Sequence, residues 1–427
     1  MTAQRSFIAW SIIALVVAAA LACPARAAER VTVESAQARI RSGPGNYFEV
    51  ISVATKGATL DVIELANNWY RIKLPQGGEG FVSAKSIGGG DRTASLRGFR
   101  PSEDMQGVGN VSRSEIMAAT KGVAEMGPFA RGYAARQGID PSVLQSLMAP
   151  VFTPAEFRAF KGRIGVGPAD PITGMDGRVS IPFEGRAMEA VDYEVGAAVA
   201  MKIVATSPLS RDRALRAYVS MVGTALVEQT PYYDEPFVFL VIESPLVRSF
   251  STPGGYVFIT TGALSVMRDE AALAGVLAHE IVHVVERHGI KELGKQAQRI
   301  KSSTMMDTLD AEVDQLGMDT GDRRVAAELD AMTDEMYEHI IGGRKRADED
   351  TSDRLGTMVI YNTGYTATGI ADFLAGAARA GEAGGSDAYR SADERIGLIN
   401  KLIKQKYMTQ SSRRNNADRF AEFVRVR

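Results

Sequence analysis

The spacing of apolar residues divides the chain into a β-rich part and a helical part. Between about residues 30 and 88, short apolar runs alternate with polar positions and are broken by Gly43-Pro44-Gly45, Lys56-Gly57 and Pro75-Gln76-Gly77-Gly78. This pattern predicts a small antiparallel barrel. Its expected strands contain Ile40-Arg41, Val50–Val53, Leu60–Ile63, Trp69–Ile72 and Gly80–Val82. We expect Trp69 and Phe81 to fill its core.

Beyond Gly88-Gly89-Gly90, which we interpret as a linker, apolar residues recur at helical spacing. Helices are expected within Ser112–Gln137, Val143–Met148 and from Thr153-Pro154, where Thr can cap and Pro fits the first helical position. Further on, the pattern predicts helices at Glu189–Val204 and Arg211–Glu228, a strand at Phe237–Ile242 and a turn-strand unit at Pro253–Gly262. That second strand is a plausible edge for an extended substrate, although an ordinary core strand fits equally.

These elements predict an α+β fold, with a mainly helical domain containing a small β-sheet after a small all-β barrel. We expect four segments: a signal peptide at 1–27, the barrel at 30–88, a linker and helical connector at 89–185, and the mainly helical domain at 186–427. The polar stretch 291–343 follows the histidine-containing helix described below, and it is either a lid over that helix or a solvated helical hairpin.

The most informative stretch is Leu273–His288, which up to Val285 is apolar except for the motif His279-Glu280-x-x-His283 and then ends in Glu286-Arg287-His288. Asp269 and Glu270 suit the positive end of a helix and Gly289 suits its end, so we predict one buried helix over about residues 269–287. Residues four apart lie on one helix face. His279 and His283 can therefore hold one tetrahedral Zn²⁺, while Glu280, on a different face, can reach a water at that ion. The alternative is a pair of core histidines.

A zinc site of this kind needs a third protein ligand. His288 lies five residues after His283 and points elsewhere on the helix, so a supporting role fits it better. The position six residues after His283 is Gly289, which cannot bind metal. The spacing leaves several downstream residues open, and these are Glu335, Glu338, His339 and Glu349.

Thr252–His288 and Gly343–Phe373 resemble the CAAX-prenyl-protease/HtpX-type family of zinc metallopeptidases, especially its soluble exported branch. The motifs that establish the resemblance are Pro253-Gly254-Gly255-Tyr256, Leu277–His283, Arg287-His288 and Glu349-Asp350-Thr351-Ser352-Asp353. The resemblance implies that Glu349 is the third ligand of one zinc ion per chain. It also implies that Asp353 supports the site from behind, as zinc histidines require.

The chain departs from that family in three places. Ser352 replaces the usual Ala, and Arg248-Ser249-Phe250-Ser251 stands where Asn-Ala-Phe-Ala is usual. The family's His-Pro before Glu394-Arg395-Ile396 is missing, and Tyr389 precedes that segment instead. We name Tyr389 and Gly255 as candidates for oxyanion or substrate contacts.

The β-rich part resembles a bacterial SH3 domain through Arg39–Pro44, the Lys56-Gly57 turn, Trp69–Ile72 and Gly80–Val82. Such domains often bind cell-wall peptides or glycan, so the cell wall is a candidate partner. Phe81 stands where that family usually has Trp.

Composition and the N-terminal sequence limit the partners and the cellular location that we expect. The net charge of −2 over 427 residues gives no reason to expect nucleic acid as a partner. Arg5, the apolar run Phe7–Ala22 and Ala25-Arg26-Ala27 predict a cleaved secretion signal. Cleavage after Ala27 removes Cys23, the only cysteine, although lipoprotein processing at Cys23 is an alternative. No later run is long enough to cross a bilayer, so we expect an exported, periplasmic protein.

Together these features predict a zinc-dependent endopeptidase that acts on protein or peptide substrates in the cell envelope, in protein quality control. Two alternatives remain. One is a cell-wall peptide hydrolase, because an SH3-like module with zinc is a common pairing in such enzymes. The other is a chaperone or scaffold without catalysis that holds extended chains in the same groove.

Overall fold

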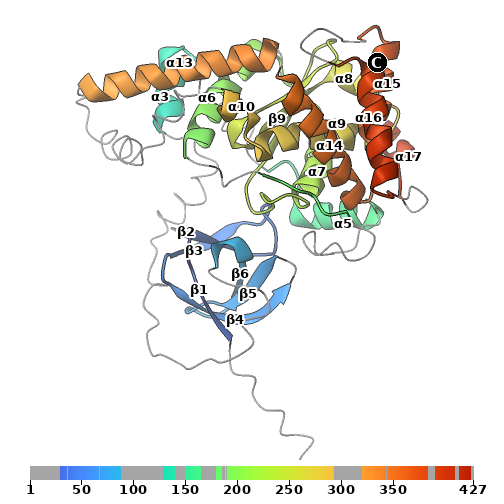
Figure 1. Ribbon diagram of the computed structural model, residues 1–427. Coiled ribbons are helices and arrows are strands. Elements are labelled where there is room, and N and C mark those ends of the chain that lie inside the picture. Colours follow the sequence, from blue (N-terminus) through green and yellow to red (C-terminus); the bar gives the residue numbers. More distant parts are fainter. Residues whose placement is uncertain are drawn as a thin grey trace, which may run out of the picture. The chain divides into compact units, whose positions relative to one another are not determined.

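A computed structural model shows the fold of the chain (Figure 1). It describes residues 29–35, 37–66, 68–87, 128–140, 150–164, 179–184, 188, 190–292, 320–342, 344–382, 390–408 and 413–424. The expected signal peptide with Cys23, the helix at Val143–Met148 and most of the expected lid lie outside these residues. Within them, no helix is both long and apolar enough to span a bilayer.

The β-rich part forms a six-stranded sheet in the order β1-β4-β5-β6-β2-β3. All five predicted strands are present, and β1 precedes them. Trp69 is buried, as expected, but Phe81 is only half-buried, because Gly80 and Val82 on either side of it face the core instead. The expectation that Phe81 fills the core is therefore wrong. The strands are β1 Glu29–Thr32, β2 Gln37–Arg41, β3 Val50–Thr55, β4 Thr59–Ala66, β5 Trp69–Lys73 and β6 Glu79–Ser83, and the 3-10 turn η1 Ala84–Ser86 follows.

The helical part contains a three-stranded sheet in the order β7-β9-β8. β7 (Val238–Ile242) runs parallel to β9 (Tyr256–Thr260), and β8 (Ser249–Thr252) runs antiparallel to it. All five residues of β9 are buried. Of the two alternatives for the strand at Pro253–Gly262, the core strand is correct, because β9 is the central strand, and β8 just before it is one of the two edges.

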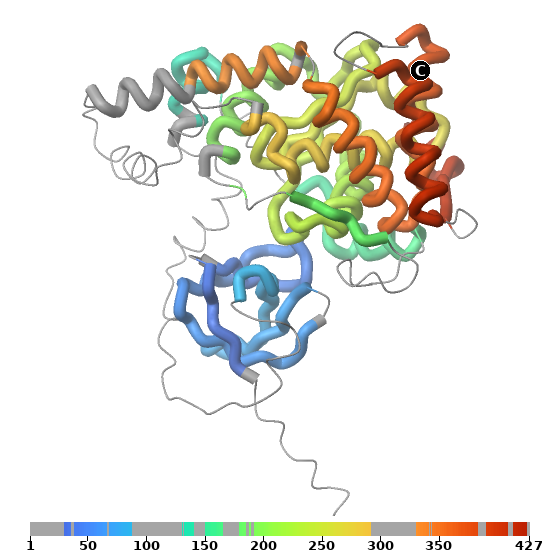
Figure 2. Tube along the Cα trace, viewed as in Figure 1, coloured from blue at the N-terminus to red at the C-terminus, as the bar shows by residue number. Residues whose placement is uncertain are grey.

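The helix with the histidine motif, α9 (Glu270–Val285), lies at the centre of the helical part (Figures 1 and 2). Every one of its residues is buried. Asp269 caps its start by accepting a hydrogen bond from the Ala272 amide at 2.9 Å. The helix ends two residues before the predicted Arg287, because Arg287 adopts φ 55°. The Arg287 guanidinium pairs there with the buried Asp192 at 2.7 Å, which favours this turn.

Among the described helices, those with the most extensive contacts to α9 are α7 (Arg213–Val227), α14 (Arg346–Thr363) and α15 (Gly369–Arg379). Glycines allow the closest approach. A Cβ on Gly275 would lie 2.5 Å from the Ile370 nitrogen, and one on Gly369 would lie 2.0 Å from the Ala271 oxygen. These contacts fix α15 closely against α9.

The remaining helices surround this centre. They are α3 Pro128–Arg136, α5 Pro154–Ile164, α6 Ala190–Thr206, α8 Thr261–Ser265, α10 His288–Glu292, α13 Thr320–Gly342, α16 Ala392–Gln405 and α17 Ala417–Phe423, with the 3-10 turn η2 Pro253–Gly255 between β8 and β9. The predicted cap of α5 is present, because the Thr153 hydroxyl accepts a hydrogen bond from the Glu156 amide at 3.2 Å.

The C-terminal helix is anchored to the start of α9 by a buried carboxylate. Glu270 is fully buried and accepts hydrogen bonds from the hydroxyls of Tyr218 at 2.8 Å and Tyr365 at 2.7 Å. The Arg419 guanidinium of α17 pairs with the same carboxylate. The described end of the chain thus forms a last helix, α17, that packs on the rest of the helical part.

Candidate metal centre

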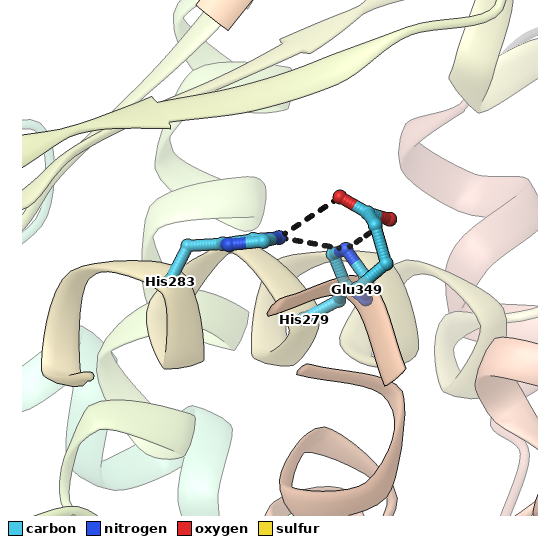
Figure 3. A group of neighbouring side chains, drawn as sticks. All are labelled: His279, His283 and Glu349. Atoms are coloured by element: carbon cyan, nitrogen blue, oxygen red, sulfur yellow. Dashed lines mark hydrogen bonds and ion pairs between the residues drawn. The ribbon is translucent and has the colours of Figure 1, made fainter. Parts of the chain in front are cut away.

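Three predicted residues meet between α9 and α14 (Figure 3). His279 and His283 lie one turn apart on α9, and Glu349 projects toward them from the first turn of α14. The two imidazole Nε2 atoms are 3.1 Å apart. Glu349 Oε2 lies 3.3 Å from His279 Nε2, and its Oε1 lies 3.3 Å from His283 Nε2.

These separations fit a tetrahedral zinc ion. Bond lengths of about 2.0–2.1 Å and tetrahedral angles place neighbouring donor atoms about 3.3 Å apart. The three measured distances are 3.1, 3.3 and 3.3 Å. Two imidazoles and one carboxylate are also a donor set that catalytic zinc sites use, with a fourth position left for water or substrate. The residues present therefore fit the ion that the sequence predicts.

His279 is oriented by an ion pair behind it. Its Nδ1 lies 3.0 Å from Asp353 Oδ1, one turn along α14 from Glu349. Arg395 of α16 donates to both oxygens of Asp353 at 2.7 Å. With Nδ1 as donor, the His279 proton is fixed on the ring nitrogen away from the site, which leaves Nε2 free to bind a metal.

His283 has a different support. Its Nδ1 lies 2.9 Å from Nδ1 of His288, and His288 Nε2 lies 3.5 Å from Asp348 Oδ1. Burial and the Arg344 charge lower the pKa of His288 to about 3, so its ring is neutral near pH 7. Its Nδ1 can therefore accept a hydrogen bond from the Nδ1–H of His283. The structure thus places His288 next to His283, at the start of the separate helix α10.

The charges at the centre suit cation binding. Burial opposes ionisation of Glu349, but the two histidines outweigh it and hold the Glu349 pKa well below its usual value. Burial also opposes the charge on His279, yet Glu349 and Asp353 raise the pKa of His279 to about 10. Burial and the Arg344 charge lower the pKa of His283. Because a ligating imidazole must be unprotonated, a cation bound here replaces the proton on His279.

Glu280 lies on the side of α9 that faces β8. Ser249 Oγ donates to its Oε1 at 2.8 Å, and Ser251 Oγ donates to its Oε2 at 3.0 Å. Burial raises the pKa of the Glu280 carboxyl, while the charges of His279 and Arg344 and the Ser249 hydrogen bond act against this rise. A carboxylate whose pKa is raised by burial is a better base near neutral pH.

Other sequence candidates lie elsewhere. Tyr389 is outside the described residues. Gly255 lies in the η2 turn with φ 92°, and a Cβ there would be 2.6 Å from the Pro236 oxygen, so local packing alone explains the glycine. Glu335 and His339 pair with each other at 3.7 Å on the surface of α13, and Glu338 is exposed on the same helix.

Sequence reasoning missed four side chains around the centre: Ser249, Ser251, Arg344 and Arg395. The two serines were visible only as departures from a family pattern. Arg344 donates to the Ser251 carbonyl oxygen at 2.6 Å, a contact between residues 93 positions apart that no local pattern reveals. Arg395 is part of a Glu-Arg-Ile segment whose arginine could equally have been structural.

Residues 213–411 match the model of peptidase family M48, and residues 36–88 match that of the bacterial SH3 domain. The putative beta-barrel assembly-enhancing protease of Vibrio cholerae is 28% identical over 167 residues, 39% of this chain and 34% of that protein. The beta-barrel assembly-enhancing protease of Escherichia coli K12 is 27% identical over 190 residues, 44% of this chain and 37% of that protein.

A shorter stretch resembles the mitochondrial metalloendopeptidase OMA1 of Schizosaccharomyces pombe, at 37% identity over 76 residues, 18% of this chain and 23% of that protein. The chain spans about a third of the length of the assembly-enhancing proteases it matches, at 34% and 37%.

Proposed function

The chain is a member of peptidase family M48 that carries a bacterial SH3 domain, and from this premise we propose that it is an exported, zinc-dependent endopeptidase. We assign one zinc ion to His279, His283 and Glu349. The observation that supports this assignment best is the spacing of the three donor atoms, because 3.1, 3.3 and 3.3 Å fit a single tetrahedral ion.

When bound there, zinc lowers the pKa of a coordinated water and polarises the scissile carbonyl. The residues of the chain transfer the protons and orient the zinc ligands. Glu280 takes a proton from the attacking water and passes it to the leaving amine, so it ends the reaction unprotonated. Asp353 and His288 hold the two imidazoles in the tautomer that presents Nε2.

The substrates we propose are proteins of the cell envelope, in particular misfolded or misassembled ones. Two observations support this class. The relatives from Vibrio cholerae and Escherichia coli are named beta-barrel assembly-enhancing proteases. The N-terminal sequence also has the pattern of a secretion signal, which implies a periplasmic location where the cell has an outer membrane. The SH3 domain would then hold the enzyme at the cell wall or on a partner protein.

The test compares metal content and proteolysis of the mature protein with those of three variants. Wild type is expected to hold one zinc per chain and to cleave unfolded casein. His279→Ala and Glu349→Ala should lose both properties, whereas Glu280→Gln should keep zinc and lose cleavage. His339→Ala, a histidine on the surface of α13, is the matched control and should behave as wild type.

Two outcomes would replace this proposal. Release of muropeptides from purified sacculi, without cleavage of casein, would identify a cell-wall hydrolase, which the SH3 match makes the second candidate. A Glu280→Gln protein that still performs the function of wild type in cells would identify a non-catalytic scaffold.

A further inference from the structure

Both carboxylate oxygens of Glu280 are bound by serine hydroxyls from one strand. Ser249 Oγ lies 2.8 Å from Oε1, and Ser251 Oγ lies 3.0 Å from Oε2. Ser251 Oγ also lies 3.1 Å from the Glu280 carbonyl oxygen, so this hydroxyl contacts both the side chain and the backbone of the residue. Glu280 and Ser251 are buried and Ser249 is half-buried.

The strand itself is held firmly, which makes the two hydroxyls fixed points. Side chains two apart on a strand lie on one face, so Ser249 and Ser251 both face α9. Phe250 between them lies on the other face and stacks on Phe258 of β9, with ring centroids 5.1 Å apart. Arg344 donates to the Ser251 carbonyl at 2.6 Å. The position of Glu280 is therefore set by β8 as well as by its own helix.

We propose that Ser249 and Ser251 are positioning residues that hold the Glu280 carboxylate in one orientation for proton transfer. This inference rests on the proposed peptidase function. A carboxylate oxygen has two lone pairs. With one lone pair on each oxygen occupied by a serine hydroxyl, the carboxylate cannot rotate freely, and a lone pair on each oxygen stays available to take the proton of the attacking water.

The hydroxyl group suits this task through the whole reaction. A serine hydroxyl can donate to a carboxylate and also to a carboxylic acid, which keeps acceptor capacity. It can therefore donate to the same lone pair before and after proton transfer, while the proton from water sits on the other lone pair, directed to the leaving amine. The proton enters from water and leaves to the amine, so neither serine gains or loses one. Alanine at either position removes the oxygen without adding bulk, and alanine is what the resembling family usually has there.

The kinetic test measures kcat and KM separately on zinc-loaded protein. Ser249→Ala and Ser251→Ala are each expected to lower kcat about 10- to 100-fold, since losing one hydrogen bond to a charged group corresponds to such a factor. KM and zinc content should stay within twofold of wild type. Ser249→Thr, which keeps a hydroxyl, should restore most of the rate. Unchanged kcat in the double alanine variant would overturn the proposal.

Two matched controls separate positioning from general damage. Ser244→Ala removes a half-buried hydroxyl that accepts from the Leu246 amide, and Ser220→Ala changes a buried serine on α7. Both should keep wild-type kcat. If either lowers kcat as much as the β8 variants do, loss of any serine in this domain is sufficient and the proposal fails.

A structural measurement keeps the inference testable even if the wild-type protein cleaves nothing. High-resolution crystal structures of wild type and of the double variant Ser249→Ala/Ser251→Ala would be compared. The Glu280 carboxylate is expected in one conformation in wild type and in a displaced or split conformation in the variant. An identical single conformation in both would refute the positioning role. Inactive wild type with displaced Glu280 in the variant would refute only the peptidase function.

Discussion

Replacing Asp353 with asparagine removes the charge behind His279 while keeping almost the same shape. Asp353 is buried and makes three short polar contacts, at 3.0 Å to His279 Nδ1 and at 2.7 Å to each of two Arg395 nitrogens. The asparagine oxygen can still accept from His279 or from Arg395. Its NH₂ group, however, would lie where a carboxylate oxygen accepts from His279 or Arg395, so two donors would face each other. The Arg395 charge would also lose its counterion.

The expected result is weaker zinc binding. Loss of a group that orients a zinc ligand typically costs about 10- to 100-fold in metal affinity, or about 1.4–2.7 kcal/mol. Because Asp353 is buried and bonded on both oxygens, we expect a value in the upper half of that range. The assay is competition between the chelator-stripped protein and a fluorescent zinc chelator of known affinity.

Asp350→Asn is the matched control, because it makes the same substitution three residues earlier on α14. Asp350 is partly exposed and pairs with Arg390 at 2.8 Å on the surface, where such pairs contribute at most about 1 kcal/mol to stability. Its zinc affinity should stay within about twofold of wild type. An Asp353→Asn protein that binds zinc as tightly as Asp350→Asn would refute the reasoning.

Three further perturbations test other parts of the structure. Arg344→Gln removes a positive charge that lowers the Glu280 pKa, so the acid limb of the kcat/KM profile should move to higher pH; an unmoved limb would contradict this. Arg419→Ala leaves the fully buried Glu270 without its cation and should lower the free energy of unfolding, measured by far-UV circular dichroism, by about 3–5 kcal/mol. A decrease under about 1 kcal/mol would contradict the anchoring of α17 by Glu270. In chelator-treated protein, the His279 pKa rises from 6.5 to about 10 on folding. The resulting stabilisation is complete below about pH 6.5 and disappears as the pH approaches about 10. The free energy of unfolding in urea should therefore decrease over this pH range in wild type, and this decrease should be missing in His279→Gln.

Much of this architecture could be predicted because its signals are local. The alternation of apolar residues with Gly and Pro turns indicates the strands of the barrel, and the apolar run with Asp269 before it indicates α9. A spacing of four residues places His279 and His283 on one face whatever the rest of the fold does. Glu349 could not be reached in this way, because its distance along the chain leaves other acids equally possible. Only the resemblance selected it, and the structure brings it to the two histidines.

The sequence by itself determined which reactive groups are available. These are the two imidazoles and the carboxylate of His279, His283 and Glu280 on one helix, and the acidic residues around Glu349 downstream. The tertiary structure decided which groups surround them. β9 is the central strand and β8 lies at an edge, and β8 brings two serines to Glu280. Arg395 and Asp353 meet across 42 residues, and the C-terminal helix reaches back to Glu270. These contacts depend on how helices and strands pack, which the period of a single element does not encode, because each joins side chains from elements that are far apart in the chain.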